Sequence, residues 1–168
     1  MASVKGFEVK AIKGFRGSEG EPLQQANLYC ENKKVGFLRD NADGGAPVIQ
    51  VEGEYEEKWK EAIAYFKEHL YDAKEVATGE ELFYFLVTIK EWERIVRQQL
   101  KNGYSAIAFL EEIDQAYGYR TGGYKVFASH SDEELETIDE AVSNALDATA
   151  PIEWKKSLYH SVDDLNFQ

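Results

Sequence analysis

The sequence predicts an α+β fold, in which an antiparallel sheet carries about three helices packed on one face. Apolar residues recur at every second position in several parts of the first fifty residues, as strands require. From about residue 54 they recur at every third or fourth position instead, as helices require. The strand-rich parts are joined mostly by hairpin turns, which connect antiparallel strands and so favour this class over a doubly wound parallel sheet.

The first fifty residues are expected to form three or four strands. Phe7 and Val9 alternate with charged neighbours, and the same alternation returns after a glycine-rich turn segment at 14–22. Polar residues at 31–34 form a reversal between the next two strands. The strands are expected at 7–11, 26–31, 35–38 and 48–52.

Two amphipathic helices are expected in the middle of the chain. Five large apolar residues share one helical face over about 54–71, and they are Tyr55, Trp59, Ile63, Phe66 and Leu70. A second helix is expected from Glu80 to about Lys101, where Asn102 and Gly103 form a stop signal. The aromatic and β-branched content of 82–89 also permits a strand there.

The last third is expected to form a hairpin, a helix and a tail. Strands at 104–110 and 124–129 flank a long loop, and Ser131 with Glu134 has the spacing of a capping box that begins a third helix. The segment from Pro151 is only weakly patterned. We therefore expect one domain over 1–168, with parts that are strand-rich (1–52), helical (53–102), hairpin plus helix (103–147) and tail (148–168).

The charge of the chain is negative and unevenly distributed. The formal net charge is -12, and residues 101–150 carry three Lys or Arg against ten Asp or Glu. Such a field repels phosphate backbones and anionic lipids, so neither direct nucleic-acid binding nor membrane binding is expected unless a local basic face exists. A protein with a basic surface is the expected partner, and a homo-oligomer stays open.

The sequence also indicates a cellular compartment. Cys30 is the single cysteine, so no intramolecular disulfide can form, as suits a reducing compartment. We find no apolar stretch of about 18 residues and no secretory signal. A cytoplasmic location is therefore expected.

The expected third helix carries the candidate partner-binding residues. Its carboxylates fall off the apolar stripe and share a solvated face, where some also suit the helix dipole. The candidates are Glu133, Glu136, Asp139 and Glu140, with Glu111 and Glu112 nearby in sequence. They either form ordinary surface or present a phosphate-like array to a basic cleft on another protein.

The loop from Asp40 to Pro47 is a second candidate site. Its glycines would let backbone amides approach a ligand, and its acidic and amide residues offer oxygen atoms; the candidates are Asp40, Asn41, Asp43, Gly44 and Gly45. A calcium-loop alignment fails, because it places Arg39 and Gln50 where carboxylate ligands are needed. The loop is therefore either a plain connection between strands or a site for another ligand.

No catalytic or metal-binding motif is present. The glycines at 14–20 fit no nucleotide-binding pattern, and His69, His130 and His160 lack the spacing of metal ligands. We therefore expect no catalytic residue, metal or cofactor, although a site assembled from distant residues stays open. Tyr84 is expected off the core stripe, either in a protein interface or at a sheet edge.

Three segments of the first fifty residues resemble a known group of proteins. Asn27-Leu28-Tyr29, Lys33-Lys34-Val35-Gly36 and the Asp40 to Pro47 loop are similar to a hairpin and a polar Gly-Gly loop in small uncharacterised accessory proteins of phages and other mobile elements. The likeness covers about residues 5–50, and it implies no catalytic residue. It implies a mobile-element accessory role.

Three functional hypotheses follow. The first is a non-enzymatic acidic protein-binding module, in the form of a phage or mobile-element inhibitor of a host nucleic-acid-handling or defence protein. The second is a small enzyme or a ligand- or metal-binding protein that uses the Asp40–Gly45 loop. The third is a structural protein that self-associates through aromatic surfaces.

Overall fold

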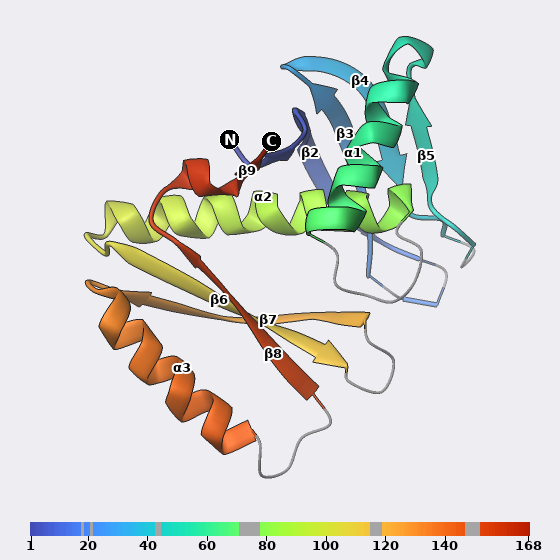
Figure 1. Ribbon diagram of the computed structural model, residues 1–168. Coiled ribbons are helices and arrows are strands. Elements are labelled where there is room, and N and C mark those ends of the chain that lie inside the picture. The colour runs from blue at the N-terminus through green and yellow to red at the C-terminus, as the bar shows by residue number, and fades with distance from the viewer. Residues whose placement is uncertain (18, 21, 43–44, 71–77, 115–118, 147–151) are drawn as a thin grey trace. The chain divides into compact units, whose positions relative to one another are not determined.

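The described part of the chain contains three α-helices and two β-sheets, and this confirms the predicted α+β class (Figure 1). The computed structural model describes residues 1–168 except 18, 21, 43–44, 71–77, 115–118 and 147–151. Only the backbone is described at 22, 111–114, 119–123, 139, 141–146 and 152–156. The strands form two sheets, where the sequence led us to expect one.

The chain divides into two compact units. Unit 1 comprises 1–71, 76–92 and 165–168, and unit 2 comprises 72–75 and 93–164. Each unit holds one of the two sheets. A single domain over 1–168 stays a prediction.

Unit 1 is built on a six-stranded sheet with the order β5-β4-β3-β2-β1-β9. All neighbouring strands are antiparallel except β1 and β9, which are parallel. The strands are β1 (Ser3–Val4), β2 (Phe7–Arg16), β3 (Pro22–Cys30), β4 (Lys33–Arg39), β5 (Val48–Val51) and β9 (Asn166–Phe167). The expected turn segment at 14–22 is shorter than predicted, because β2 and β3 extend into it.

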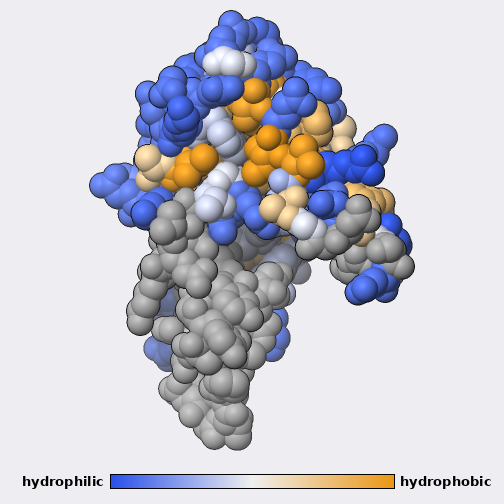
Figure 2. All heavy atoms as spheres, turned by 90° about the vertical axis from the view of Figure 1, so that its right-hand side faces the viewer, coloured by the Kyte–Doolittle hydropathy of each residue, from blue (hydrophilic) through white to orange (hydrophobic). Residues whose placement is uncertain are grey.

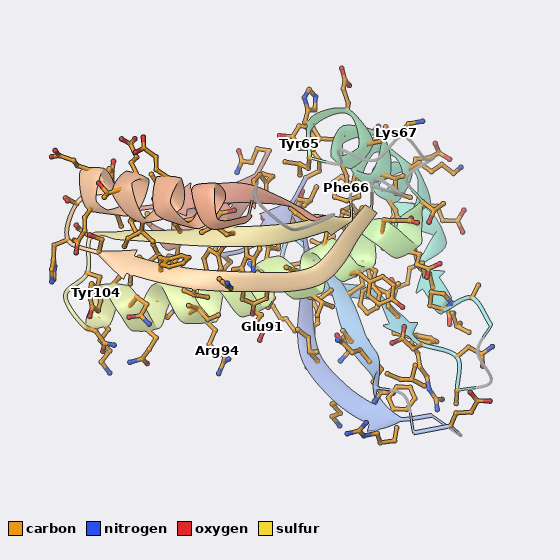
Figure 3. The ribbon with its side chains drawn as sticks, turned by 90° about the horizontal axis from the view of Figure 1, so that it is seen from below. Tyr65, Phe66, Lys67, Glu91, Arg94 and Tyr104 are labelled. Carbon is orange, nitrogen blue, oxygen red and sulfur yellow. The ribbon has the colours of Figure 1, made fainter. Side chains whose placement is uncertain are left out.

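Helices cover the apolar face of this sheet. The short 3-10 helix η1 (Gly53–Tyr55) leads into α1 (Glu56–His69), and these together match the helix predicted at 54–71. Trp59 of α1 packs edge-on against Phe7 of β2, with ring centroids 5.1 Å apart. Phe66 of α1 (Figure 3) contacts Phe85 of the next helix, and all four rings are buried. These contacts close the core of unit 1.

The second predicted helix is also present, as α2 (Gly79–Lys101). Thr78 and Glu81 form its N-terminal capping box: the Thr78 hydroxyl accepts a hydrogen bond from the Glu80 amide, and the Glu81 carboxylate accepts one from the Thr78 amide. The helix ends where predicted, at Lys101. Shortly after it Gly103 adopts a φ of 93°, a left-handed backbone conformation that glycine adopts more easily than other residues. The strand that 82–89 also permitted does not form.

Unit 2 contains a three-stranded antiparallel sheet with the order β7-β6-β8. Its strands are β6 (Ala106–Asp114), β7 (Tyr119–Ser129) and β8 (Ile152–Tyr159). The prediction made the loop between β6 and β7 too long: it was expected at 111–123, but β6 continues to Asp114 and β7 begins at Tyr119. The tail expected at 148–168 was also wrong: β8 pairs with the central strand, and the 3-10 helix η2 (Val162–Leu165) and β9 follow it.

The third predicted helix forms as α3 (Asp132–Leu146) and packs on this sheet. Leu135 is 1% exposed and lies over Ala106 and Ala108, with Phe127 and Leu158 packed around it. The two alanines leave room for the helix to approach β6. In the part of the chain that the structure describes, no helix is long and apolar enough to cross a membrane.

Strand β5 is an edge of the six-stranded sheet, and its fit depends on Gly36. A Cβ atom on Gly36 would lie 2.0 Å from the Gln50 carbonyl oxygen, because β4 and β5 approach closely there. Figure 2 shows hydrophobic residues among hydrophilic ones on the side of unit 1 that carries β5, whose Val48 is 52% exposed. The edge strand is held to the sheet at a point where only glycine fits.

We predict that Gly36→Ala destabilises the protein by about 1–3 kcal/mol, because the backbone of β5 must move away to relieve the clash. Urea unfolding followed by circular dichroism measures the change. Gly53→Ala is the matched control, since a Cβ atom there meets nothing within 4 Å. Equal midpoints for the two variants would contradict the assignment.

Candidate partner-binding surface

Helix α3 begins at a polar cap that fixes its direction. The Ser131 hydroxyl accepts a hydrogen bond from the Glu134 amide at 3.3 Å, as predicted for an N-cap residue. The Glu134 carboxylate does not close the capping box on Ser131; it binds the Ser129 hydroxyl, which in turn accepts a hydrogen bond from the Ser131 amide. The cap therefore uses a residue from the end of β7 as well.

Two of the α3 carboxylates have partners inside the protein. Asp132 lies 3.6 Å from the Nε2 atom of His160, and Glu134 binds Ser129 as described above. Both pairs tie the first turn of α3 to the sheet of unit 2. These carboxylates are therefore parts of the fold.

Three further carboxylates have no such partner. Glu133, Glu136 and Glu140 are exposed, and no described residue forms an ion pair or a side-chain hydrogen bond with them. Their spacing of three and four residues puts them along one side of the helix. We call these three residues the acidic stripe.

Nothing on α3 itself can neutralise the acidic stripe. The helix carries six Asp or Glu and no Lys or Arg between Asp132 and Leu146. Leu135 anchors the opposite side of the helix in the core, so the stripe stands on a fixed support. The arrangement can present a row of negative charge to a partner.

The remaining predicted partner-binding residues are only partly described. Glu111 and Glu112 lie in β6, opposite Tyr124 on β7 and Trp154 on β8 respectively, and their side chains are outside the described residues. The side chain of Asp139 is outside them too. The structure therefore does not test whether these three join the acidic stripe.

The Asp40 loop has a structural role at its first residue. Asp40 is 7% exposed, and both of its carboxylate oxygens accept hydrogen bonds of 2.6 Å, one from the Gln24 amide and one from the Tyr84 hydroxyl. The Asp40 amide also donates to the Gln24 carbonyl oxygen. The carboxylate therefore ties α2 to β3, and its hydrogen bonds occupy both oxygens.

The two other loop candidates that the structure describes, Asn41 and Gly45, add no converging ligands. Asn41 is half-buried and Gly45 is exposed, while Asp43 and Gly44 lie outside the described residues. A Cβ atom on Gly45 would meet the side-chain Nδ2 atom of Asn41 at 2.7 Å, so the two residues lie close together. In the described ranges of the chain, no three His, Cys, Asp or Glu side chains form a group that could hold a metal ion.

Burial and neighbouring carboxylates raise the pKa values of two groups near Asp40. Burial, and then the hydrogen bond to Asp40, raises the pKa of the Tyr84 phenol above its ordinary value of 10.0. Burial and the neighbouring carboxylates of Glu81 and Asp40 raise the pKa of Glu80. The sequence predicted that Tyr84 would be exposed, and the residue is 37% exposed, but its hydroxyl group is not free.

Two histidines that are far apart in sequence contact the same residue, Ser105, at one end of the unit 2 sheet. The Ser105 hydroxyl donates to the His130 carbonyl oxygen, and the Nδ1 atom of His160 lies 3.2 Å from the Ser105 carbonyl oxygen. His130 also stacks on Tyr104. No sequence signal predicted this meeting, because it depends on β8, which the sequence analysis missed.

No comparison links the chain to a known protein: no family model matches it, and neither a curated protein nor a solved structure shows significant similarity to it.

We predict that Tyr84→Phe destabilises unit 1 by about 1–3 kcal/mol, because a buried oxygen of Asp40 loses its donor. Denaturant unfolding at neutral pH measures the loss. Tyr65→Phe is the matched control, since the Tyr65 ring packs under Lys5 and beside His69. A loss as large in the control would show that the hydrogen bond is not the cause.

The same contact predicts a loss of stability at alkaline pH. Below about pH 10 both the folded and the unfolded chain keep the Tyr84 proton. As the pH rises above that value, the unfolded chain releases the proton and the folded chain retains it, so the free energy of unfolding falls. Unfolding measured at pH 8 and near pH 11 should show a smaller fall for Tyr84→Phe than for the unchanged protein, and identical falls would be the contrary result.

Proposed function

We propose that the protein is a non-enzymatic binding module that presents the acidic stripe of α3 to a basic cleft on another protein. The observation that carries the proposal is the set of three exposed carboxylates, Glu133, Glu136 and Glu140, which have no partner among the described residues. Such a row does not stabilise the folded protein, because like charges three and four residues apart on a helix repel one another. A partner with cations at matching positions would remove that cost.

The physical effect of the stripe would be greatest in a cleft. A single exposed ion pair contributes only about 0.2–1 kcal/mol, because water and salt screen it. Within a cleft the charges are partly desolvated, their interaction is stronger, and the field speeds the encounter of the two proteins. We therefore expect binding to weaken as the salt concentration rises.

The charge pattern also indicates the kind of partner. A row of negative charges spaced along a helix resembles the charge of a nucleic-acid backbone, so clefts that bind nucleic acid are suited to it. A module that fills such a cleft excludes the nucleic acid and acts as an inhibitor. Together with the resemblance of residues 5–50 to accessory proteins of mobile elements, this supports inhibition of a host nucleic-acid-handling or defence protein.

The alternative site at the Asp40 loop has weaker support. A ligand at Asp40 would have to displace the hydrogen bonds from Tyr84 and from the Gln24 amide, and so would open the connection between α2 and β3. The loop is better explained as part of the fold of unit 1. We therefore favour the α3 surface.

The proposal is tested by capture of partners from a cell lysate at low and high salt. We predict that the unchanged protein captures a partner at low salt and releases it at high salt, and that the triple variant Glu133→Lys, Glu136→Lys and Glu140→Lys captures at least tenfold less of it. The reversal replaces attraction by repulsion at each position. Nuclease treatment of the lysate removes bridging through nucleic acid.

A control variant separates the position of the charge from its amount. Glu56→Lys, Glu61→Lys and Glu91→Lys change three exposed helical glutamates elsewhere and give the same net charge. This variant should capture the partner almost as well as the unchanged protein. An equal loss of partner capture in both variants, or capture that high salt does not weaken, would contradict the proposal.

A further inference from the structure

The strands of unit 1 carry charge of the sign opposite to that of the chain. Strands β2, β3, β4 and β5 together contain six Lys or Arg and a single Asp or Glu, in a chain whose net charge is -12. One face of their sheet holds the buried residues Val9, Leu28 and Leu38, which belong to the core. The other face holds most of the exposed cations, and we call it the open sheet face.

The strand register brings these cations together. Lys13, Gln25, Arg39 and Val48 form a row across four neighbouring strands, so their side chains share one face. The next row contains Lys10, Asn27, Phe37 and Gln50. The open sheet face thus alternates cations with amide and aromatic side chains.

A bulge in β2 is needed for this arrangement. Lys10 and Lys13 are three residues apart, and in a regular strand they would point to opposite faces. The register shifts between them, and Ala11 adopts a φ of 54° there. The extra residue turns both lysines to the open sheet face.

The cations of this face are available for a ligand. Lys34 pairs with Tyr29, which pairs with Glu8, so it lies in a third row of the same face. Lys13, Lys34 and Arg39 are exposed, and none of them forms an ion pair with a described carboxylate. The one carboxylate of the face, Glu8, has a side chain only 4% exposed and lies 2.9 Å from Lys10 and 3.8 Å from Lys90. The uncompensated charge of the open sheet face is therefore positive.

Aromatic side chains lie between the cations. Phe37 is 37% exposed and stands in the row beside that of Arg39. The Arg39 guanidinium lies 5.4 Å from the centre of the Phe15 ring, which holds its planar group in place. Lys10 lies over Tyr29 in the same way, at 4.6 Å.

We propose that the open sheet face binds a single strand of nucleic acid. Lys13, Lys34 and Arg39 contact the phosphates, and a base stacks on Phe37. Proteins that bind single strands combine a cationic track with aromatic platforms in this way, since every base has a face that can stack. A duplex hides its bases, so it can use only the phosphate contacts.

The net negative charge of the chain does not prevent this binding. At physiological ionic strength, charges more than about 8 Å away are largely screened, so the local cations decide the interaction. The local basic face that the composition alone could not reveal is present on these strands. The site belongs to the strands of unit 1, whereas the acidic stripe belongs to α3 in unit 2, and it does not depend on the function proposed for α3.

Fluorescence anisotropy with labelled oligo(U) and oligo(dT) of about 12 nucleotides tests the proposal at several salt concentrations. We expect saturable binding near 50 mM salt that weakens as salt rises, and weaker binding of a duplex of equal length. Phe37→Ala should reduce the affinity by about tenfold with the salt dependence unchanged, because stacking is lost and no charge is removed.

The lysines have a different expected signature. Lys13→Gln and Lys34→Gln should each reduce the slope of log affinity against log salt by about 0.7, as expected for one lost phosphate contact on a single strand. Lys67→Gln on α1, an exposed lysine on another element (Figure 3), is the matched control and should leave the slope unchanged. Circular dichroism of each variant verifies that it is folded. Absence of binding near 50 mM salt, preference for the duplex, or equal effects of Lys67→Gln and Lys13→Gln would overturn the proposal.

Discussion

The distribution of charge among the elements is set by the need of each sheet to bury one face under helices. In unit 1 the buried residues of β2 to β5 are apolar except Glu8, which lies 3.8 Å from Lys90 of α2, and the other charged residues of these strands are exposed or half-buried. In unit 2 the apolar side of α3 packs on β6, and Glu133, Glu136 and Glu140 on the other side face solvent. Both surfaces that we propose to be functional follow from this constraint.

Opposite charges are thereby carried by different elements. Helix α3 contains carboxylates and no cations, while β2 to β5 contain cations and a single carboxylate. Two other carboxylates have partners: the buried Glu8 lies 2.9 Å from Lys10, and the exposed Asp132 lies 3.6 Å from His160. The charges left without partners, on the acidic stripe and on the open sheet face, are those available to other molecules.

The sequence predicted the elements whose pattern is local and periodic. The spacing of Trp59 and Phe66 predicted α1, and the stop signal at Gly103 predicted the end of α2. Strand β8 was missed because its pattern is weak, and its pairing with β6 joins residues 38 to 52 positions apart. The division of the strands into two sheets depends on such long-range pairing, which a local pattern does not contain.

The candidate surfaces were predictable to different degrees. The exposure of Glu133, Glu136 and Glu140 followed from helical spacing alone, whereas the pairing of Asp132 with His160 required the three-dimensional fold. The tie between Asp40 and Tyr84 spans 44 residues, so the sequence suggested a ligand loop where the structure has an internal contact. The open sheet face was hidden because the bulge at Ala11 breaks the alternation from which faces are predicted.

The central claim is that unpaired positive and negative charges occupy separate surfaces that bind separate molecules. NMR titration of the folded protein tests it most directly, with a lysine-rich peptide in one series and a single-stranded oligonucleotide in the other. The account predicts that the peptide shifts signals of Glu133, Glu136 and Glu140, and that the oligonucleotide shifts signals of Lys13, Phe37 and Arg39. Overlapping sets of shifted residues, or small shifts spread evenly over the chain, would contradict it.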